Sequence, residues 1–172
     1  MGLIVGLMVL AVVGAVVQLA RDRQPRTMGR VAEVFLLWLL VVGVGVVGVV
    51  AFFAHTVLAD QTARSIDWPE GNPFQTEVAM ANLATAALGI LCFWIRGNFW
   101  TATVIATSVW LLGDAVVHVV QIVNRGNYSP GNAGIPLYID ILFPLILIGL
   151  FVIYKARGQG AVGPPRRTPR VS

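Results

Sequence analysis

Residues 31–55 have the sequence VAEVFLLWLLVVGVGVVGVVAFFAH, in which Glu33 and His55 are the only ionisable residues. A helix needs about 20 predominantly apolar residues to cross the hydrocarbon core of a bilayer. This stretch therefore predicts a transmembrane helix. Similar apolar runs on either side of it predict four more spans, at about 2–20, 73–95, 99–123 and 136–154. We expect an all-α fold, an integral membrane bundle of five transmembrane helices.

The composition agrees with a lipid environment. Hydrophobic residues make up 57% of the chain and charged residues only 12%, about half the charged fraction of an average soluble domain. We expect one transmembrane domain, residues 1–157, followed by a disordered, basic, cytoplasmic tail at 158–172 that is rich in Gly, Pro and Arg. The single cysteine, Cys92, falls in an apolar run and is interpreted as a buried, unreactive thiol.

The distribution of basic residues predicts the orientation. Four arginines lie in 21–30 and the tail after 154 is basic, whereas 56–72 is mainly acidic. Because positive charge favours the cytoplasmic side, we expect the N-terminus outside and the C-terminus in the cytoplasm, with the plasma (inner) membrane as the location. No basic region precedes the apolar part of 2–20, so we interpret this span as an anchor and not as a cleaved signal peptide.

The basic segments and the glycines predict the partners. The basic segments flank the spans instead of covering a folded face, so we expect contacts with anionic membrane lipids and no binding of nucleic acid. Gly43, Gly45 and Gly48 form a small-residue surface suited to close helix packing. The glycines of the first two spans also favour a homo-oligomer.

Polar side chains inside the spans identify candidate functional residues, because each costs about 2.5–3.5 kcal/mol on insertion scales. They are Glu33, His55, Glu77, Asn82, Asp114, His118, Gln121 and Asp140. We expect Glu33 at the inner face, paired with Arg30. Under the predicted orientation, the histidines and the other three carboxylates fall within roughly the outer 15 Å of the membrane, since a helix rises about 1.5 Å per residue.

The fourth span carries a polar stripe. Its members are Thr103, Thr107, Asp114, His118 and Gln121. Because successive residues of an α-helix are rotated by about 100°, these side chains lie within about 40° of one line along the helix. Such a stripe must face the bundle interior or water, because lipid cannot satisfy polar groups. Trp110, in the same span, is interpreted as a packing residue.

The cluster of acids and imidazoles predicts a metal site that serves redox or hydrolytic chemistry. The candidate ligands are His55, Glu77, Asp114, His118 and Asp140. These donors suit Zn, Fe, Mn or Cu, while the three carboxylates speak against bis-histidine haem. Asp114 and His118 are also the candidate catalytic acid/base pair, and Asn82 and Gln121 the supporting groups. Glu77 and Asn82 differ by about 140° around their helix, so both face one point only if the helix end is distorted.

Other functions fit the same residues. The Asp/His stripe without metal would suit a proton-coupled or small-solute transport protein, and a polar face that docks a partner would suit an accessory subunit of a membrane complex.

Residues 72–75, Asn-Pro-Phe-Gln, are typical of a helix start, with Asn72 as N-cap and Gln75 at the third helical position.

Two runs carry a resemblance to a known family. NPFQTEVAMANLA at 72–84 and GDAVVHVVQ at 113–121, with GNAG at 131–134 and the Asp140/Pro144 pair, resemble a family of small multi-pass bacterial membrane proteins of unknown function. The resemblance covers about residues 55–150 and implies no activity. The Asp-x-x-x-His step is also similar to the copper-site motif of membrane monooxygenase subunits, although Pro130 stands where that motif has a further histidine.

Overall fold

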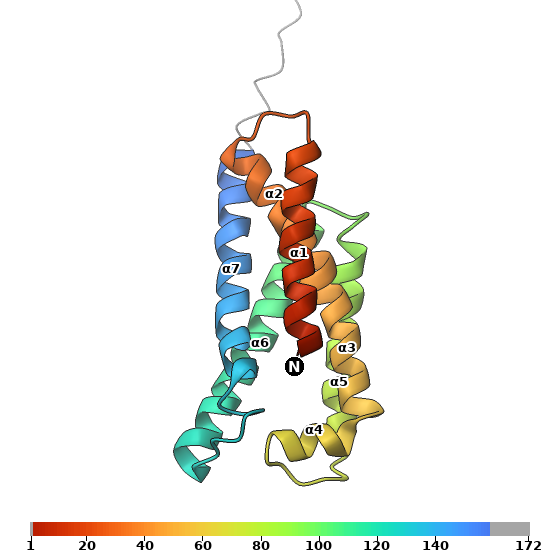
Figure 1. The fold of residues 1–172 in the computed structure, drawn as a ribbon, viewed down its shortest axis with the longest axis vertical. Coiled ribbons are helices and arrows are strands. Elements are labelled where there is room, and N and C mark those ends of the chain that lie inside the picture. Colours follow the sequence, from red (N-terminus) through yellow and green to blue (C-terminus); the bar gives the residue numbers. More distant parts are fainter. Residues whose placement is uncertain (1, 159–172) are drawn as a thin grey trace, which may run out of the picture.

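The structure, a computed structural model, describes residues 2–158, and in this part of the chain the secondary structure is helical, without a β-strand (Figure 1). The predicted tail, 158–172, lies outside the described residues except for Gly158, with which the last helix ends. The helices are α1 (Gly2–Arg21), α2 (Met28–Trp38), the π-helix η1 (Leu39–Val46), α3 (Val47–Thr56), α4 (Ala59–Ser65), α5 (Phe74–Leu91), α6 (Asn98–Arg125) and α7 (Ile135–Gly158).

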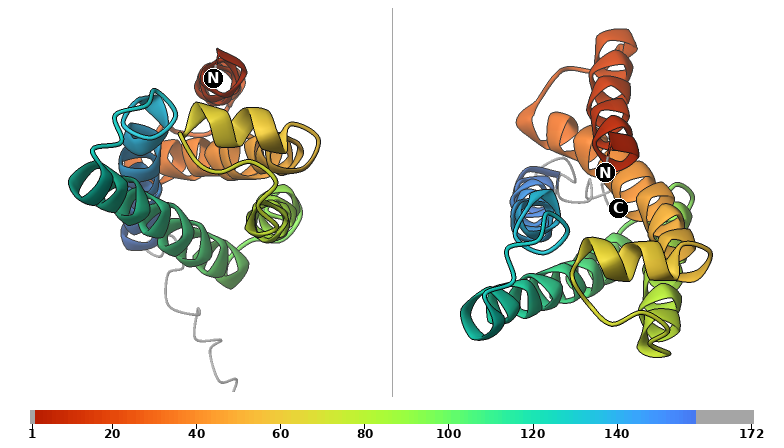
Figure 2. Two further views of the ribbon diagram at one scale, coloured as in Figure 1. Left: turned by 90° about the horizontal axis from the view of Figure 1, so that it is seen from below. Right: turned by 60° about the horizontal axis from the view of Figure 1, so that its bottom comes forward.

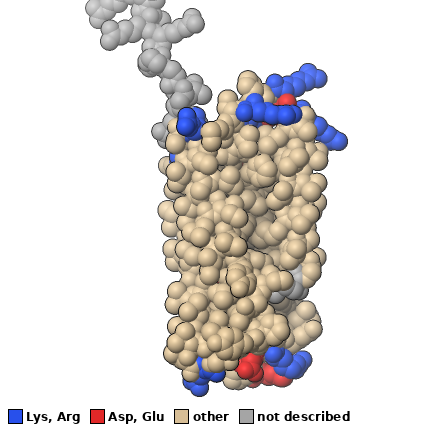
Figure 3. Space-filling view, turned by 60° about the vertical axis from the view of Figure 1, so that its left-hand side comes forward, with Lys and Arg blue, Asp and Glu red and all other residues tan. Residues whose placement is uncertain are grey.

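Four of the helical runs are long and apolar enough to cross a membrane, which indicates a membrane protein. They are α1, the continuous run Met28–Thr56, α6 and α7, and each contains one of the predicted spans. The predicted span 73–95 corresponds to the shorter α5, which is not among the four. The polar residues Gln75, Glu77 and Asn82 lower its hydropathy. Figure 3 shows charged residues at the two ends of one face, with an uncharged band between them.

The glycines of the longest helical run, Met28–Thr56, pack against other helices of the same chain. A Cβ placed on Gly89 of α5 would lie 2.5 Å from the backbone nitrogen of Gly45 and 2.7 Å from the carbonyl oxygen of Leu40, both in η1. Gly43 faces Phe143 of α7, and Gly48 faces Ala86 of α5. The expected small-residue surface therefore brings α5 and α7 against this run, while the homo-oligomer stays a prediction.

One end of the bundle carries an ion-pair network. Arg30 contacts Asp22 at 2.6 Å and Glu33 at 2.9 Å, which confirms the expected Arg30–Glu33 pair, and Arg96 reaches Glu33 at 3.1 Å. A hydrogen bond from the Gln24 backbone N–H and the Arg30 guanidinium lower the pKa of Asp22 below its ordinary value. The network joins the α1–α2 loop, α2 and the α5–α6 turn at the same end.

The short helix α4 lies across the opposite end of the bundle (Figure 2). The Thr62 hydroxyl donates to the Ala54 carbonyl at 2.7 Å, which ties α4 to the end of α3. The Asn127 amide donates to the Ile66 carbonyl at 2.8 Å, and the Gly131 backbone N–H donates to the Ser65 carbonyl at 3.0 Å. The segment 56–72, which the hydropathy pattern leaves between spans, is therefore a helical cap joined to the α6–α7 loop.

The Gly45–Gly89 contact predicts a specific destabilisation. We expect Gly89→Ala to lower the free energy of unfolding by about 1–3 kcal/mol, because backbone atoms of η1 occupy the space for the new methyl group. Thermal unfolding in detergent micelles measures this, with a maleimide dye that reports exposure of the buried Cys92 thiol.

Gly149→Ala in α7 is the matched control. Gly149 is exposed and has no atom within 4 Å of the added Cβ, so alanine should stabilise the helix slightly, by about 0.5–1 kcal/mol. Equal effects of the two substitutions would contradict the close contact.

Candidate functional site

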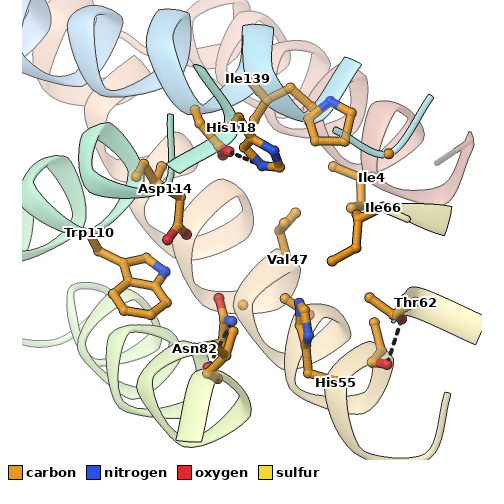
Figure 4. Close-up of a pocket in the computed structure, with 18 of the residues that line it drawn as sticks. Ile4, Val47, His55, Thr62, Ile66, Asn82, Trp110, Asp114, His118 and Ile139 are labelled. Carbon is orange, nitrogen blue, oxygen red and sulfur yellow. Dashed lines mark hydrogen bonds and ion pairs between the residues drawn. The ribbon is translucent and has the colours of Figure 1, made fainter. Parts of the chain in front are cut away.

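A cavity of about 420 Å³ lies inside the bundle beneath the cap. Side chains from α3, α5, α6 and α7 form its walls, α4 and the following loop cover one end, and Ile4 and Met8 of α1 reach it from the side. Figure 4 shows His55, Asn82, Trp110, Asp114 and His118 around this space. The lining is mainly apolar, so the polar groups stand out as a small set.

Five of the seven predicted site residues line this cavity. They are His55, Asn82, Asp114, His118 and Asp140. Glu77 and Gln121 do not line it. The cavity face of α5 follows the helical repeat through Gln75, Val78, Asn82 and Thr85, and this puts Asn82 inward and leaves Glu77 exposed.

A buried asparagine fixes the ring of His118. The Asn132 Nδ2 group donates to the carbonyl oxygens of His118, at 3.3 Å, and Asn127, at 2.9 Å. Its Oδ1 atom therefore faces His118 Nδ1, at 2.8 Å, and must accept the proton on that nitrogen. Asn132 is 0% exposed, so water does not compete for these bonds.

This arrangement turns the second ring nitrogen of His118 toward Asp140. With a proton fixed on Nδ1, the other ring nitrogen, Nε2, faces Asp140 Oδ2 at 3.5 Å. Either the imidazole carries a second proton and pairs with a carboxylate, or a neutral carboxyl group faces the lone pair of Nε2. The groups that contact the imidazole are therefore Asn132 and Asp140.

His55 is held in the same way from another wall. Its Nδ1 atom lies 2.5 Å from Gln75 Oε1, and Gln75 Nε2 donates to the Ala59 carbonyl at 3.0 Å. Gln75 therefore does not cap its own helix as the sequence suggested; α5 begins at Phe74, whose N–H donates to Asn72 Oδ1. The His55 Nε2 atom has no partner among the described residues.

Asp114 has no hydrogen-bond or ion-pair partner among the described residues, although it lines the cavity near His118 and Asp140. Three further cavity groups are buried without a partner in the described part of the chain: Trp68 Nε1, Thr107 Oγ1 and Trp110 Nε1. Trp110 is therefore a cavity residue as well as a packing residue. Such unpaired groups are costly inside a protein unless something else satisfies them.

The geometry gives the metal prediction no support. Within residues 2–158, no three His, Cys, Asp or Glu side chains are grouped closely enough to hold a metal ion. Nδ1 of each histidine is already hydrogen-bonded to a carboxamide oxygen. What the site offers instead is an unpaired carboxylate, an imidazole–carboxylate pair and an apolar enclosure.

Sequence reasoning missed three contributors to the site: Asn132, Gln75 and Trp68. Asn132 lies within the GNAG run that carried the family resemblance, but no periodicity connects a loop residue with a helix residue 14 positions earlier. Gln75 was identified only as a helix-start residue. For Asn132 and Gln75, the sequence signal that could have identified them was a carboxamide side chain close to the end of a predicted span.

The comparisons identify a family but no characterised relative. The sequence model of a family of unknown function, DUF6790, matches residues 1–160. The match is wider than the 55–150 expected from the resemblance and includes the first span. No curated protein and no solved structure matches the chain.

Replacing Asn132 should loosen His118. We expect Asn132→Ala to lower the free energy of unfolding by about 1–3 kcal/mol, because buried carbonyl groups and the ring lose their partner. The ¹⁵N spectrum of the labelled imidazole should also change from one fixed tautomer, protonated at Nδ1, to a mixture.

Asn124→Ala, at an exposed position of α6, serves as the control and should change neither quantity. An unchanged His118 tautomer in Asn132→Ala would show that the asparagine does not orient the ring.

Proposed function

Because the chain belongs to the family of unknown function DUF6790, no activity comes to it from a relative, and we propose from the cavity itself that the protein binds a small, largely apolar molecule within the membrane. We further propose that the His118–Asp140 pair and Asp114 exchange a proton with that molecule. A proton-linked carrier and an acid–base membrane enzyme would both use this site.

The proposal is supported by a largely apolar cavity that the cap covers at one end and that contains unpaired polar groups. Its volume of about 420 Å³ falls in the range of small-molecule sites, which are mostly apolar with a few convergent polar groups. Ionisable residues at membrane depth are kept where they serve a site. A purely structural network would instead satisfy its own members, whereas Asp114, Thr107 and Trp110 have no partner among the described residues.

The proton step is supported by the fixed ring of His118. Because Asn132 occupies Nδ1, any second proton on the ring lies at Nε2, between the imidazole and Asp140. A molecule that enters the cavity and contacts either partner changes how tightly that proton is held. Among residues 2–158, no Lys or Arg lines the cavity, so no permanent cation from this part of the chain suppresses the exchange.

We also propose that the chain crosses the plasma membrane five times. In this topology α5 is a span in addition to the four long apolar runs. The basic residues at the ion-pair end outnumber those at the capped end: Arg21, Arg23, Arg26, Arg30, Arg96, Lys155 and Arg157 against Arg64 and Arg125. This asymmetry favours a cytoplasmic ion-pair end and an N-terminus outside. The cavity, which adjoins the cap, would then open toward the outer side.

Filling the cavity tests the proposal. We expect 4-phenylbutan-1-ol, 4-phenylbutylamine or 4-phenylbutyric acid, which share one apolar body, to change the tryptophan fluorescence of the protein in lipid nanodiscs in a saturable way. Ala51→Phe should remove the response, because Ala51 lines the cavity and the larger ring occupies it.

Ala84→Phe, on the exposed side of α5, is the matched control for partition into the lipid and should respond like the native protein. The proposal fails if none of the three compounds gives a response that depends on Ala51.

The proton step has a separate readout. The affinity of the bound compound should change with pH in the native protein, because binding alters the proton shared by His118 and Asp140. In Asp140→Asn the pair no longer exists, so the dependence should become flatter. Parallel pH profiles for the two proteins would rule out this pair as the exchanging group.

A further inference from the structure

We infer that the molecule bound in the cavity is an organic cation, a protonated amine on an apolar body, whose ammonium group pairs with Asp114. This inference rests on the proposed function and adds the chemical class of the ligand. Three observations support it: the charge of the lining, the hydrogen-bond acceptors on the cavity walls, and the aromatic side chains that line the cavity.

The charge of the lining favours a cation. The titratable side chains that face the cavity are Asp114 and His118 from α6, Asp140 from α7 and His55 from α3, and no Lys or Arg joins them. Asp140 already has an imidazole partner, His118 Nε2, at 3.5 Å. Asp114 is left without an ion-pair partner among the described residues, in a mostly apolar cavity. Its ionised form would repel an anionic ligand and attract a cation.

The groups near Asp114 have hydrogen-bond acceptors to spare. The Asn82 Nδ2 group donates to the Val78 carbonyl at 3.0 Å, which leaves its Oδ1 atom as an acceptor. Thr107 lies on the same face of α6 as Asp114, is 3% exposed and has an unpartnered Oγ1 atom. Figure 4 shows Asn82 and Asp114 on neighbouring walls of the cavity. An ammonium group carries three N–H donors, so beyond a bond to Asp114 it could also use acceptors such as Asn82 or Thr107 on the cavity walls.

Aromatic side chains complete the environment of a cation with an apolar body. Trp68, Phe74, Trp110 and Phe143 line the cavity. The faces of such rings attract cations within about 6 Å. Their apolar surface would hold the body of the ligand, and the indole N–H groups of Trp68 and Trp110 remain for a neutral acceptor such as an ether oxygen.

A comparison of three head groups on one body tests the inference. The native protein in nanodiscs is titrated with 4-phenylbutylamine, 4-phenylbutan-1-ol and 4-phenylbutyric acid at neutral pH, and the affinities are compared. We expect the amine to bind about tenfold or more tighter than the alcohol, from one charge-assisted hydrogen-bonded pair, and the acid to bind weakest.

Asp114→Asn identifies the group responsible. The amide keeps the size of the side chain but removes its charge, so the amine should lose its advantage while the alcohol still binds, which also shows that the cavity remains intact. Glu77→Gln is the matched control, because Glu77 is an exposed carboxylate outside the cavity, and it should leave the preference for the amine unchanged.

Other binding results would distinguish a failure of the cation assignment from a failure of the proposed function. If the alcohol or the acid binds as tightly as the amine and Ala51→Phe abolishes that binding, the proposed function stands and the cation assignment is overturned. A preference for the amine that survives in Asp114→Asn also overturns the assignment. If no compound binds in a cavity-dependent way, both the inference and the proposed function fail.

Discussion

The side-chain amide of Asn132 is the group on which the arrangement of the site depends. In surroundings without water, its NH₂ group must find acceptors and its oxygen a donor, and it finds them in two carbonyl groups and the ring of His118. The same bonds hold the α6–α7 loop against α6. That loop in turn contacts the cap through Gly131 and Asn127. One residue therefore determines both the orientation of the imidazole and the closure of the cavity end.

The residues that could be predicted from the sequence are those whose signal lies within one helix. Asp114, His118 and Thr107 share a face of α6 because the helical repeat places them there, and all three line the cavity. Asp140 and His55 followed from their cost in an apolar span. Glu77 satisfied the same criterion, yet it is exposed, because Asn82 sits on the opposite part of the helix and faces inward. Hydropathy alone does not tell which side of α5 the bundle covers.

The helical bundle itself was also predictable, since four long apolar runs fall where the hydropathy indicates. The cap was harder, because α4 is short and polar and is held by bonds to α3 and the α6–α7 loop. The carboxamide partners of the two histidines, Asn132 and Gln75, were hard to predict for the same reason. They depend on contacts between segments distant in sequence, which no local pattern encodes.

The π-helical turns of η1 have a consequence for the geometry of the longest run. A π-helix uses more residues per turn than an α-helix, so the number of residues in Leu39–Val46 sets the rotational phase between α2 and α3. If the segment stayed π-helical, loss of one residue there would rotate everything downstream by somewhat less than the 100° that one α-helical residue contributes, and His55 would leave the wall on which Gln75 meets it. Insertions and deletions should therefore be poorly tolerated in this segment, although it contains no ionisable residue of its own.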